Sequence, residues 1–204
     1  MKKSLIVMAL LLATLSLNAQ KPQSLFNGKN LDGWNPFTKN LSETPSSVYS
    51  VKDKCIDISG EFGYLYTDNQ YSDYKLTLEW RWVGEATNSG VFIHMRGENK
   101  AWPNCYEMQL AAGKAGDIIH AGEASSAEFA ESGKKVKKAF NEGVEKPVGE
   151  WNKMEVVSKA GTVTVYVNGV KQNQITKLSQ TSGHIGLQSE GKAIQFRAVE
   201  LIEL

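Results

Sequence analysis

The sequence predicts an all-β domain, a β-sandwich or jelly roll. Many short segments alternate apolar and polar residues, which is the pattern of strands with one buried face. These segments are rich in β-branched and aromatic residues, and turn signals separate them at regular intervals. Sheets of this kind bend, and a curved face can hold a ligand.

The N-terminal segment, residues 1–19, is expected to be a signal peptide. Two lysines precede an apolar run from Leu5 to Leu17 that is short for a bilayer span, and Ala19 is a small residue at the expected cleavage point. We therefore expect an exported protein, periplasmic or secreted, that has no membrane contact after cleavage. Its single domain would cover residues 20–204. An uncleaved membrane anchor is the alternative.

The strands follow along the rest of the chain. A tight turn at Ala160-Gly161 joins two of them into a hairpin, and Asn168-Gly169 makes a second tight turn. Residues 124–150 break the pattern, because they are charged and poor in strand formers; they form either a functional lid or rim, or a plain surface loop. The expected strands span residues 74–83, 90–96, 105–110, 151–159, 162–167, 183–191 and 194–204.

The charge balance argues against a nucleic-acid partner. The chain has 23 basic and 22 acidic residues, and two of the lysines lie in the expected signal peptide. A nucleic-acid-binding domain usually shows a basic excess or stripe. The one basic run, Lys134 to Lys138, is interpreted as a solvated segment.

The two cysteines, Cys55 and Cys105, leave two alternatives open. A disulfide is compatible with an exported protein. Two buried free thiols are the other reading, and spacing does not decide between them. With no neighbouring histidine pattern, the pair does not indicate a zinc site.

Alternation places polar side chains of several strands opposite their apolar faces. If these strands belong to one sheet, the polar side chains form one continuous patch. A general base needs an arrangement such as an imidazole beside a carboxylate, which His94 and Glu107 would provide. For Glu79 and Arg81, a solvated face with ion pairs is the favoured alternative. The polar residues of this predicted patch are Glu79, Arg81, His94, Arg96, Glu107, Gln109 and Gln188.

Two further candidates lie outside these strands. His120 belongs to a glycine-rich loop and short strand that lead into residues 124–150, and it is either a functional or a surface histidine. Trp102 lies between two of the strands that carry the patch, and its ring could stack on the apolar face of a sugar.

Several motifs, in order, resemble the domain family once called DUF1080 and now often described as 3-keto-disaccharide hydrolase. They are "SLFNGKNLDGW", "YSDYKLTLEWRW", "NSGVFIHMR", "CYEMQL", "PVGEWNKMEVV", "VYVNGV" and "GHIGLQSEGKAIQFRAVELIEL", and together they cover nearly all of the mature chain. The resemblance implies a jelly-roll sandwich of the concanavalin A-like lectin and glucanase type. It also implies a sugar substrate, of disaccharide or oligosaccharide size, whose ring carries a ketone at C3.

A 3-keto group implies chemistry based on proton abstraction, in which a base removes the C2 hydrogen and the C1 oxygen leaves; water then adds to complete a net hydrolysis. We expect His94 or Glu107 as the base, Arg96 or Arg81 as the group that stabilises the enolate oxygen, and His120 as the acid. The expected sugar-binding residues are Glu79, Arg81, Gln109, Gln188 and Trp102.

No cofactor is expected with certainty. A divalent metal is an alternative to the arginine, with His94, Glu107 and His120 as its candidate ligands. Two other functions stay open: a non-catalytic, lectin-like carbohydrate-binding module, and a conventional glycoside hydrolase that uses Glu79 and Glu107.

Overall fold

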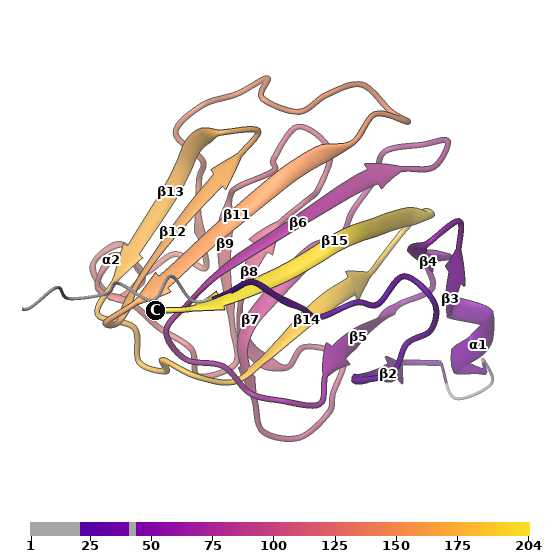
Figure 1. Ribbon diagram of the computed structural model, residues 1–204. Helices are drawn as coiled ribbons and strands as arrows, with labels where there is room; N and C mark the ends of the chain where they lie inside the picture. Colours follow the sequence, from indigo (N-terminus) through magenta and orange to yellow (C-terminus); the bar gives the residue numbers. More distant parts are fainter. Residues whose placement is uncertain (1–20, 41–43) are drawn as a thin grey trace, which may run out of the picture.

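The computed structural model describes residues 21–40 and 44–204, and it shows two antiparallel β-sheets packed face to face (Figure 1). In Figure 1 the eight-stranded sheet lies in front of the seven-stranded sheet. The predicted all-β jelly-roll sandwich is therefore confirmed. The predicted signal peptide lies outside the described residues, and among the described residues no helix is long and apolar enough to cross a membrane.

The eight-stranded sheet has the order β13-β12-β11-β6-β15-β4-β3, with β1 paired to β15. The seven-stranded sheet has the order β10-β9-β8-β7-β14-β5-β2. The strands of the first sheet are β1 (Gln23–Ser24), β3 (Tyr49–Lys52), β4 (Cys55–Ile58), β6 (Tyr74–Trp82), β11 (Asn152–Lys159), β12 (Thr162–Val167), β13 (Val170–Thr176) and β15 (Ile194–Glu203). Those of the second are β2 (Trp34–Thr38), β5 (Gly63–Thr67), β7 (Gly90–Arg96), β8 (Asn104–Gln109), β9 (Ile118–Ala121), β10 (Val136–Lys137) and β14 (His184–Ser189).

The core lies between the two sheets and is built by alternation. Along β6 every second residue is buried, from Tyr74 to Trp82, while the residues between them face outward. On β8 of the opposite sheet, Tyr106 and Met108 point into the same core. Since successive side chains of a strand point to opposite faces, Glu107 and Gln109 must lie on the outer face of the seven-stranded sheet.

Two tight turns confirm the predicted hairpins. Ala160 and Gly161 both have positive φ, 48° and 71°, and they join β11 to β12. Asn168 and Gly169, with φ of 50° and 82°, join β12 to β13. Positive φ at both central residues is the type I′ geometry, whose twist matches that of the flanking strands.

Residues 124–150 are only partly loop. They contain α2 (Ala127–Ser132), which begins after an N-cap at Ser126, and the edge strand β10. The other helix, α1 (Pro45–Val48), lies at the far end of the sandwich (Figure 1). Part of the basic run is not freely solvated, because Lys137 donates to Asn173 and Lys138 forms an ion pair with Asp117 at 2.9 Å.

The two cysteines are free thiols, and both are buried. Cys55 is on β4 and Cys105 is on β8, so they belong to different sheets. Burial raises the pKa of both thiols, as expected for groups that stay protonated inside a fold.

Candidate functional site

The outer face of the seven-stranded sheet carries a groove of about 420 Å³ beside β8 and β9. Its floor comes from β8 and β9, and its walls come from residues that flank the strands β7, β10 and β14. The lining combines carboxyl, amide, ammonium and indole groups, the mixture expected of a site for a polar ligand with apolar faces. The lining residues are Asn88, Trp102, Glu107, Gln109, Ile119, His120, Ala121, Lys135 and Glu190, together with Gly122.

Glu107 is the most deeply placed carboxyl of this groove. It is only 4% exposed, and its Oε1 has no hydrogen-bond partner. The carboxyl of Glu107 fits against the neighbouring strand β7 because Gly90 on that strand has no side chain. A Cβ on Gly90 would come within 2.7 Å of Glu107 Cγ. Burial, with a smaller contribution from Glu190, raises the pKa of Glu107 to about 8.

Glu190 is the second carboxyl of the site, and sequence reasoning missed it. It forms an isolated β-bridge with Asn88, and its Oε2 accepts a hydrogen bond from Gln188 Nε2 at 2.9 Å. Burial also raises the pKa of Glu190. Alternation could have found this residue, because it follows Gln188 by two positions and therefore shares its face.

Unsatisfied polar atoms gather at this groove. Asn88 Oδ1 and Glu107 Oε1 are buried atoms without a hydrogen-bond partner, and both residues line it. On the neighbouring strand β14, Gln188 Oε1 is buried and unsatisfied as well. Buried polar groups are nearly always satisfied in folded proteins, so a cluster of exceptions indicates a place where a ligand completes the hydrogen bonds.

Trp102 lines the groove, whereas His120 borders it only through its strand: His120 pairs with Tyr106, so its imidazole lies on the core face of β9, opposite to Glu107. The imidazole of His120 packs on the ring of Phe129 in α2, with 4.5 Å between ring centroids. Trp102 is 50% exposed, and its ring meets the ring of Phe62 edge to face at 5.2 Å. An exposed indole with one edge supported is a suitable platform for a sugar ring.

Lys135 is the one lysine or arginine that lines this groove within the described parts of the chain. The sequence interpretation of the basic run as a solvated segment missed it, because nothing local distinguishes Lys135 from the other lysines of the run. Lys135 lies beside the groove because β10, which begins at the next residue, pairs with β9.

The two glutamines of the predicted patch keep their predicted face. Gln109 lines the groove, and its Oε1 accepts hydrogen bonds from the backbone N–H groups of Leu110 and Ala111, both at 2.9 Å. That leaves its amide N–H₂ available for a ligand. Gln188 lies one strand beyond Gly90 and is tied to Glu190.

The predicted position of His94 beside Glu107 is wrong. His94 has φ of +50° and lies in a β-bulge of β7, where two residues, Ile93 and His94, oppose the single residue Ile185 of β14. The extra residue reverses the alternation, so that Met95 packs on the outer face with Phe92 and the imidazole turns inward.

His94 is a core residue that is satisfied within the fold. It is 0% exposed and packs against the rings of Tyr74 and Tyr106. Its Nδ1–H donates to the Gln180 carbonyl at 3.1 Å, so the neutral ring accepts from the Ser158 hydroxyl at Nε2, also at 3.1 Å. Burial lowers the pKa of His94 to about 4. Because the imidazole of His94 points into the core, it can act neither as a base nor as a metal ligand in the groove.

Arg96 lies outside the groove as well. Its side chain is exposed, and its guanidinium donates to both the carbonyl and the hydroxyl of Ser182. It lines a separate small cavity with Tyr66 and His184. The expectation that Arg96 stabilises an oxyanion next to Glu107 is not supported by this position.

Glu79 and Arg81 belong to the other sheet, which corrects the prediction of one continuous patch. They project from the outer face of the eight-stranded sheet. Glu79 pairs with Arg197 at 2.6 Å, and the guanidinium groups of Arg81 and Arg197 lie over the ring of Trp151 at 4.7 and 3.9 Å. The favoured alternative, a solvated face, therefore describes both residues: Glu79 forms an ion pair, and Arg81 donates to Gln195 Oε1 at 2.9 Å. A glycosidase pair of Glu79 with Glu107 is incompatible with their positions in two sheets.

The proposed metal ligands His94, Glu107 and His120 do not converge, because the imidazole of His94 points into the core. Within residues 21–40 and 44–204, no group of three or more histidine, cysteine, aspartate or glutamate side chains could hold a metal ion.

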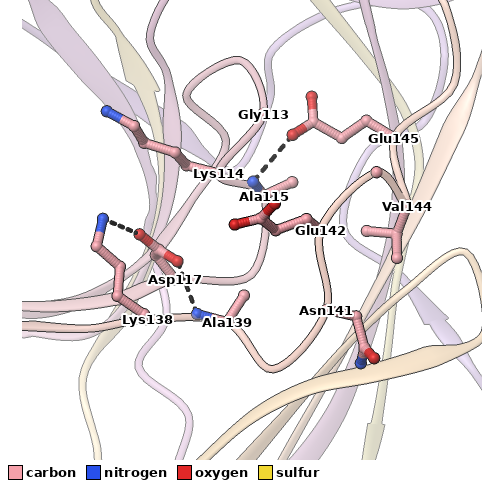
Figure 2. Close-up of a pocket in the computed structure, with 11 residues that line it drawn as sticks. Gly113, Lys114, Ala115, Asp117, Lys138, Ala139, Asn141, Glu142, Val144 and Glu145 are labelled. Atoms are coloured by element: carbon pink, nitrogen blue, oxygen red, sulfur yellow. Dashed lines mark hydrogen bonds and ion pairs between the residues drawn. The ribbon is translucent and has the colours of Figure 1, made fainter.

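Figure 2 shows another cavity, of about 360 Å³, between the turn at residues 113–117 and the loop at residues 138–145. Two of its carboxylates already accept hydrogen bonds within the protein. Asp117 accepts from Lys138 and from the backbone N–H of Ala139, and Glu145 accepts from the backbone N–H of Ala115 (Figure 2). The groove at Glu107 is the stronger candidate because the buried Glu107 Oε1 and Asn88 Oδ1 lack hydrogen-bond partners.

Comparison with known sequences identifies relatives of the chain. The family described as "3-keto-alpha-glucoside-1,2-lyase-like domain" matches residues 21–202. A 3-keto-disaccharide hydrolase of Bacteroides thetaiotaomicron is 22% identical over 167 residues. This match covers 73% of the chain and 56% of the relative, so the chain spans little more than half the length of that protein.

Solved structures share the fold. A suggested glycosyl hydrolase from Parabacteroides distasonis superposes with a TM-score of 0.68 and 22% identity, over 90% of this chain and 94% of the other. A β-glucanase of Bacillus licheniformis gives 0.62 with 10% identity, over 92% and 100%. A carbohydrate-binding module of Bacillus subtilis gives 0.60 with 8% identity, over 82% and 93%. Enzymes and binding modules therefore both occur on this fold, and fold alone does not decide between them.

Proposed function

The chain belongs to the 3-keto-alpha-glucoside-1,2-lyase-like domain family, and from this membership we propose that it cleaves glycosides whose sugar ring carries a ketone at C3. The proposed reaction is an elimination across C2 and C1, followed by hydration. The ketone acidifies the hydrogen on C2, so a base can remove that proton and leave an enolate. The enolate then expels the C1 glycosidic oxygen, which takes up a proton, and water adds to the resulting enone.

Glu107 is the proposed base. A carboxyl with a pKa of about 8 binds a proton far more readily than an ordinary carboxylate, and part of it is ionised near neutral pH. The nearby charge of Glu190 favours the proton transfer, because the negative charge on Glu107 disappears as it takes the proton. This buried, hydrogen-bond-deficient carboxyl in a groove with an exposed indole is the observation that carries the proposal.

The other groups of the groove suit the remaining steps. Lys135 supplies the positive charge for the developing enolate oxygen, a role that the sequence had suggested for an arginine. His120 is not assigned the role of acid, because it shares the core face of the sheet with Tyr106 and its ring packs on Phe129. Gln109 offers its amide to the sugar hydroxyls, and Trp102 stacks on the ring.

Isotope incorporation tests the mechanism directly. Cleavage of a 3-keto-disaccharide in D₂O is expected to place deuterium at C2 of the keto-sugar product, and deuterium at C2 of the substrate should slow the reaction. A control incubates the finished product with the protein in D₂O to measure exchange after cleavage. Cleavage without C2 deuterium and without an isotope effect would point to direct displacement and reject the elimination.

Two rival functions give different outcomes with paired substrates. A conventional glycoside hydrolase would cleave the unoxidised disaccharide, which has no acidic C2 hydrogen. A lectin-like module would bind one or both sugars and release no product. The proposed enzyme should cleave only the 3-keto form, and Glu107→Gln should abolish this cleavage while binding persists.

We also propose that the protein acts outside the cytoplasm, on the basis of the N-terminal sequence alone. Expression of the full chain in a bacterial host, followed by fractionation and N-terminal sequencing, tests this. Recovery of an uncleaved chain from the cytoplasm would contradict it.

A further inference from the structure

We propose that the outer face of the seven-stranded sheet carries a second sugar-binding subsite, at the cavity lined by Tyr66, Arg96 and Asn99. The inference rests on the proposed function in one respect: the occupant is the part of the same glycoside that lies away from the cleaved bond. The subsite locates the second sugar unit of such a substrate on the sheet.

The cavity combines an aromatic ring with planar polar groups. The ring of Tyr66 is half-buried and meets the imidazole of His184 edge to face, with centroids 5.5 Å apart. Asn99 Nδ2 donates to the hydroxyl of Tyr66 at 2.8 Å. Aromatic rings receive the apolar faces of sugars, and amide groups pair with their hydroxyls.

Arg96 is held in place by neutral groups. Its Nε donates to the Ser182 carbonyl at 2.5 Å, and its Nη2 donates to the Ser182 hydroxyl. Glu98 lines the same cavity, but no ion pair joins it to Arg96 among the described residues, so the remaining N–H groups of Arg96 are available for hydroxyl oxygens. The cavity measures about 120 Å³. A water molecule occupies about 30 Å³, so the cavity has room for the hydroxyls along one edge of a sugar ring.

Strand register aligns this cavity with the groove. Glu107 pairs with Phe92, Phe92 with Gly186, and Gly186 with Tyr66, so one cross-strand row joins the two sites. Neighbouring strands lie about 4.8 Å apart, and three steps therefore separate Glu107 from Tyr66 by roughly 14 Å. A single sugar ring at Glu107 does not reach that far, whereas a second or third ring does.

One loop contributes to both sites. Residues 97–103 connect β7 to β8, and they provide Trp102 to the groove and Asn99 to the second cavity. The loop is fixed over the sheet by Tyr64, whose hydroxyl donates to Asn99 Oδ1 at 3.4 Å and to the Lys100 carbonyl at 3.3 Å. A ligand that spans both sites would cross this loop and contact the exposed indole on the way.

Substrate length is the variable to test. Methyl 3-keto-glucoside, a 3-keto-disaccharide and the corresponding trisaccharide would be compared by steady-state kinetics. KM is expected to fall with length in the natural protein. Tyr66→Ala and Asn99→Ala should each raise KM for the longest substrate about tenfold, the size expected for loss of one stacking or hydrogen-bonding contact, and should leave KM for the methyl glycoside unchanged.

A tyrosine on the opposite face provides the matched control. Tyr166 is also half-buried, but it projects from β12 on the eight-stranded sheet, so Tyr166→Ala should change no kinetic constant. Equal KM for all three substrates in the natural protein would overturn the second subsite and leave the proposed reaction intact. An equal rise of KM for every substrate in Tyr66→Ala would also overturn it.

Binding measurements separate this failure from a failure of the proposed function. If none of the 3-keto-glycosides is cleaved, unoxidised mono-, di- and trisaccharides would be titrated by calorimetry into the natural protein and into Tyr66→Ala. Length-dependent binding that Tyr66→Ala weakens would support the subsite on a binding protein. Absence of such binding would reject it.

Discussion

Replacing Glu107 by glutamine is expected to stabilise the fold at neutral pH. Burial and the neighbouring Glu190 raise the pKa of Glu107 from 4.5 to about 8. The stability that its neutral carboxyl contributes is therefore complete below pH 4.5 and is lost as the pH rises through 8. Each pH unit between these limits corresponds to 1.36 kcal/mol, so ionisable Glu107 lowers the free energy of unfolding by about 3 kcal/mol at pH 7.

Glutamine keeps the shape of the side chain and cannot ionise. The difference in free energy of unfolding between Glu107→Gln and the natural protein should thus be small at pH 5 and grow to about 3 kcal/mol at pH 7. Urea denaturation followed by tryptophan fluorescence at pH 5, 6, 7 and 8 measures it. Glu142→Gln, at an exposed position, is the matched control and should follow the natural protein. If the curves of Glu107→Gln and the natural protein run parallel over this range, the buried ionisation is refuted.

Three further predictions follow from the same structure. His94 has its pKa lowered to about 4 by burial, so its neutral imidazole contributes its full stability above pH 6.5. In the Glu107→Gln background, this contribution to the free energy of unfolding should fall by about 3 kcal/mol as the pH drops to 4, and a flat profile would contradict the buried neutral imidazole. Gly90→Ala should displace the carboxyl of Glu107 and shift the pH profile of kcat, because a Cβ at residue 90 would lie within 2.7 Å of Glu107 Cγ. An unchanged profile would show that the carboxyl does not need this space. Trp102→Ala should leave the free energy of unfolding within about 0.5 kcal/mol of that of the natural protein, since Trp102 is half exposed. The same change should weaken sugar binding about tenfold in calorimetric titrations, and an unaltered affinity would remove Trp102 from the site.

Local alternation predicted the strands and much of the groove. Glu107 and Gln109 face outward as expected, because Tyr106 and Met108 on the same strand fill the core. The predicted faces of these two residues are right because the two-residue period of a strand is a property of the chain itself. Trp102 also lines the groove, but from the loop between β7 and β8, where alternation predicts nothing.

The alternation fails at His94, where one extra residue in β7 reverses the face. A bulge leaves the composition of a strand unchanged, and a positive φ at a histidine has no local signal. The imidazole of His94 is satisfied in the core by hydrogen bonds to Gln180 and Ser158, which are distant in the sequence. The positions of these two partners depend on the packing of the two sheets.

The sequence by itself determined the class of fold, the family and the face of each regular strand, because these depend on short-range periodicity and on ordered motifs. Only the tertiary structure decided which strands share a sheet. It separated Glu79 and Arg81 from Glu107 and joined Glu107 to Glu190 and Lys135. Such pairings join residues as distant as β6 and β15, and their energies arise from contacts that exist only once both sheets have formed.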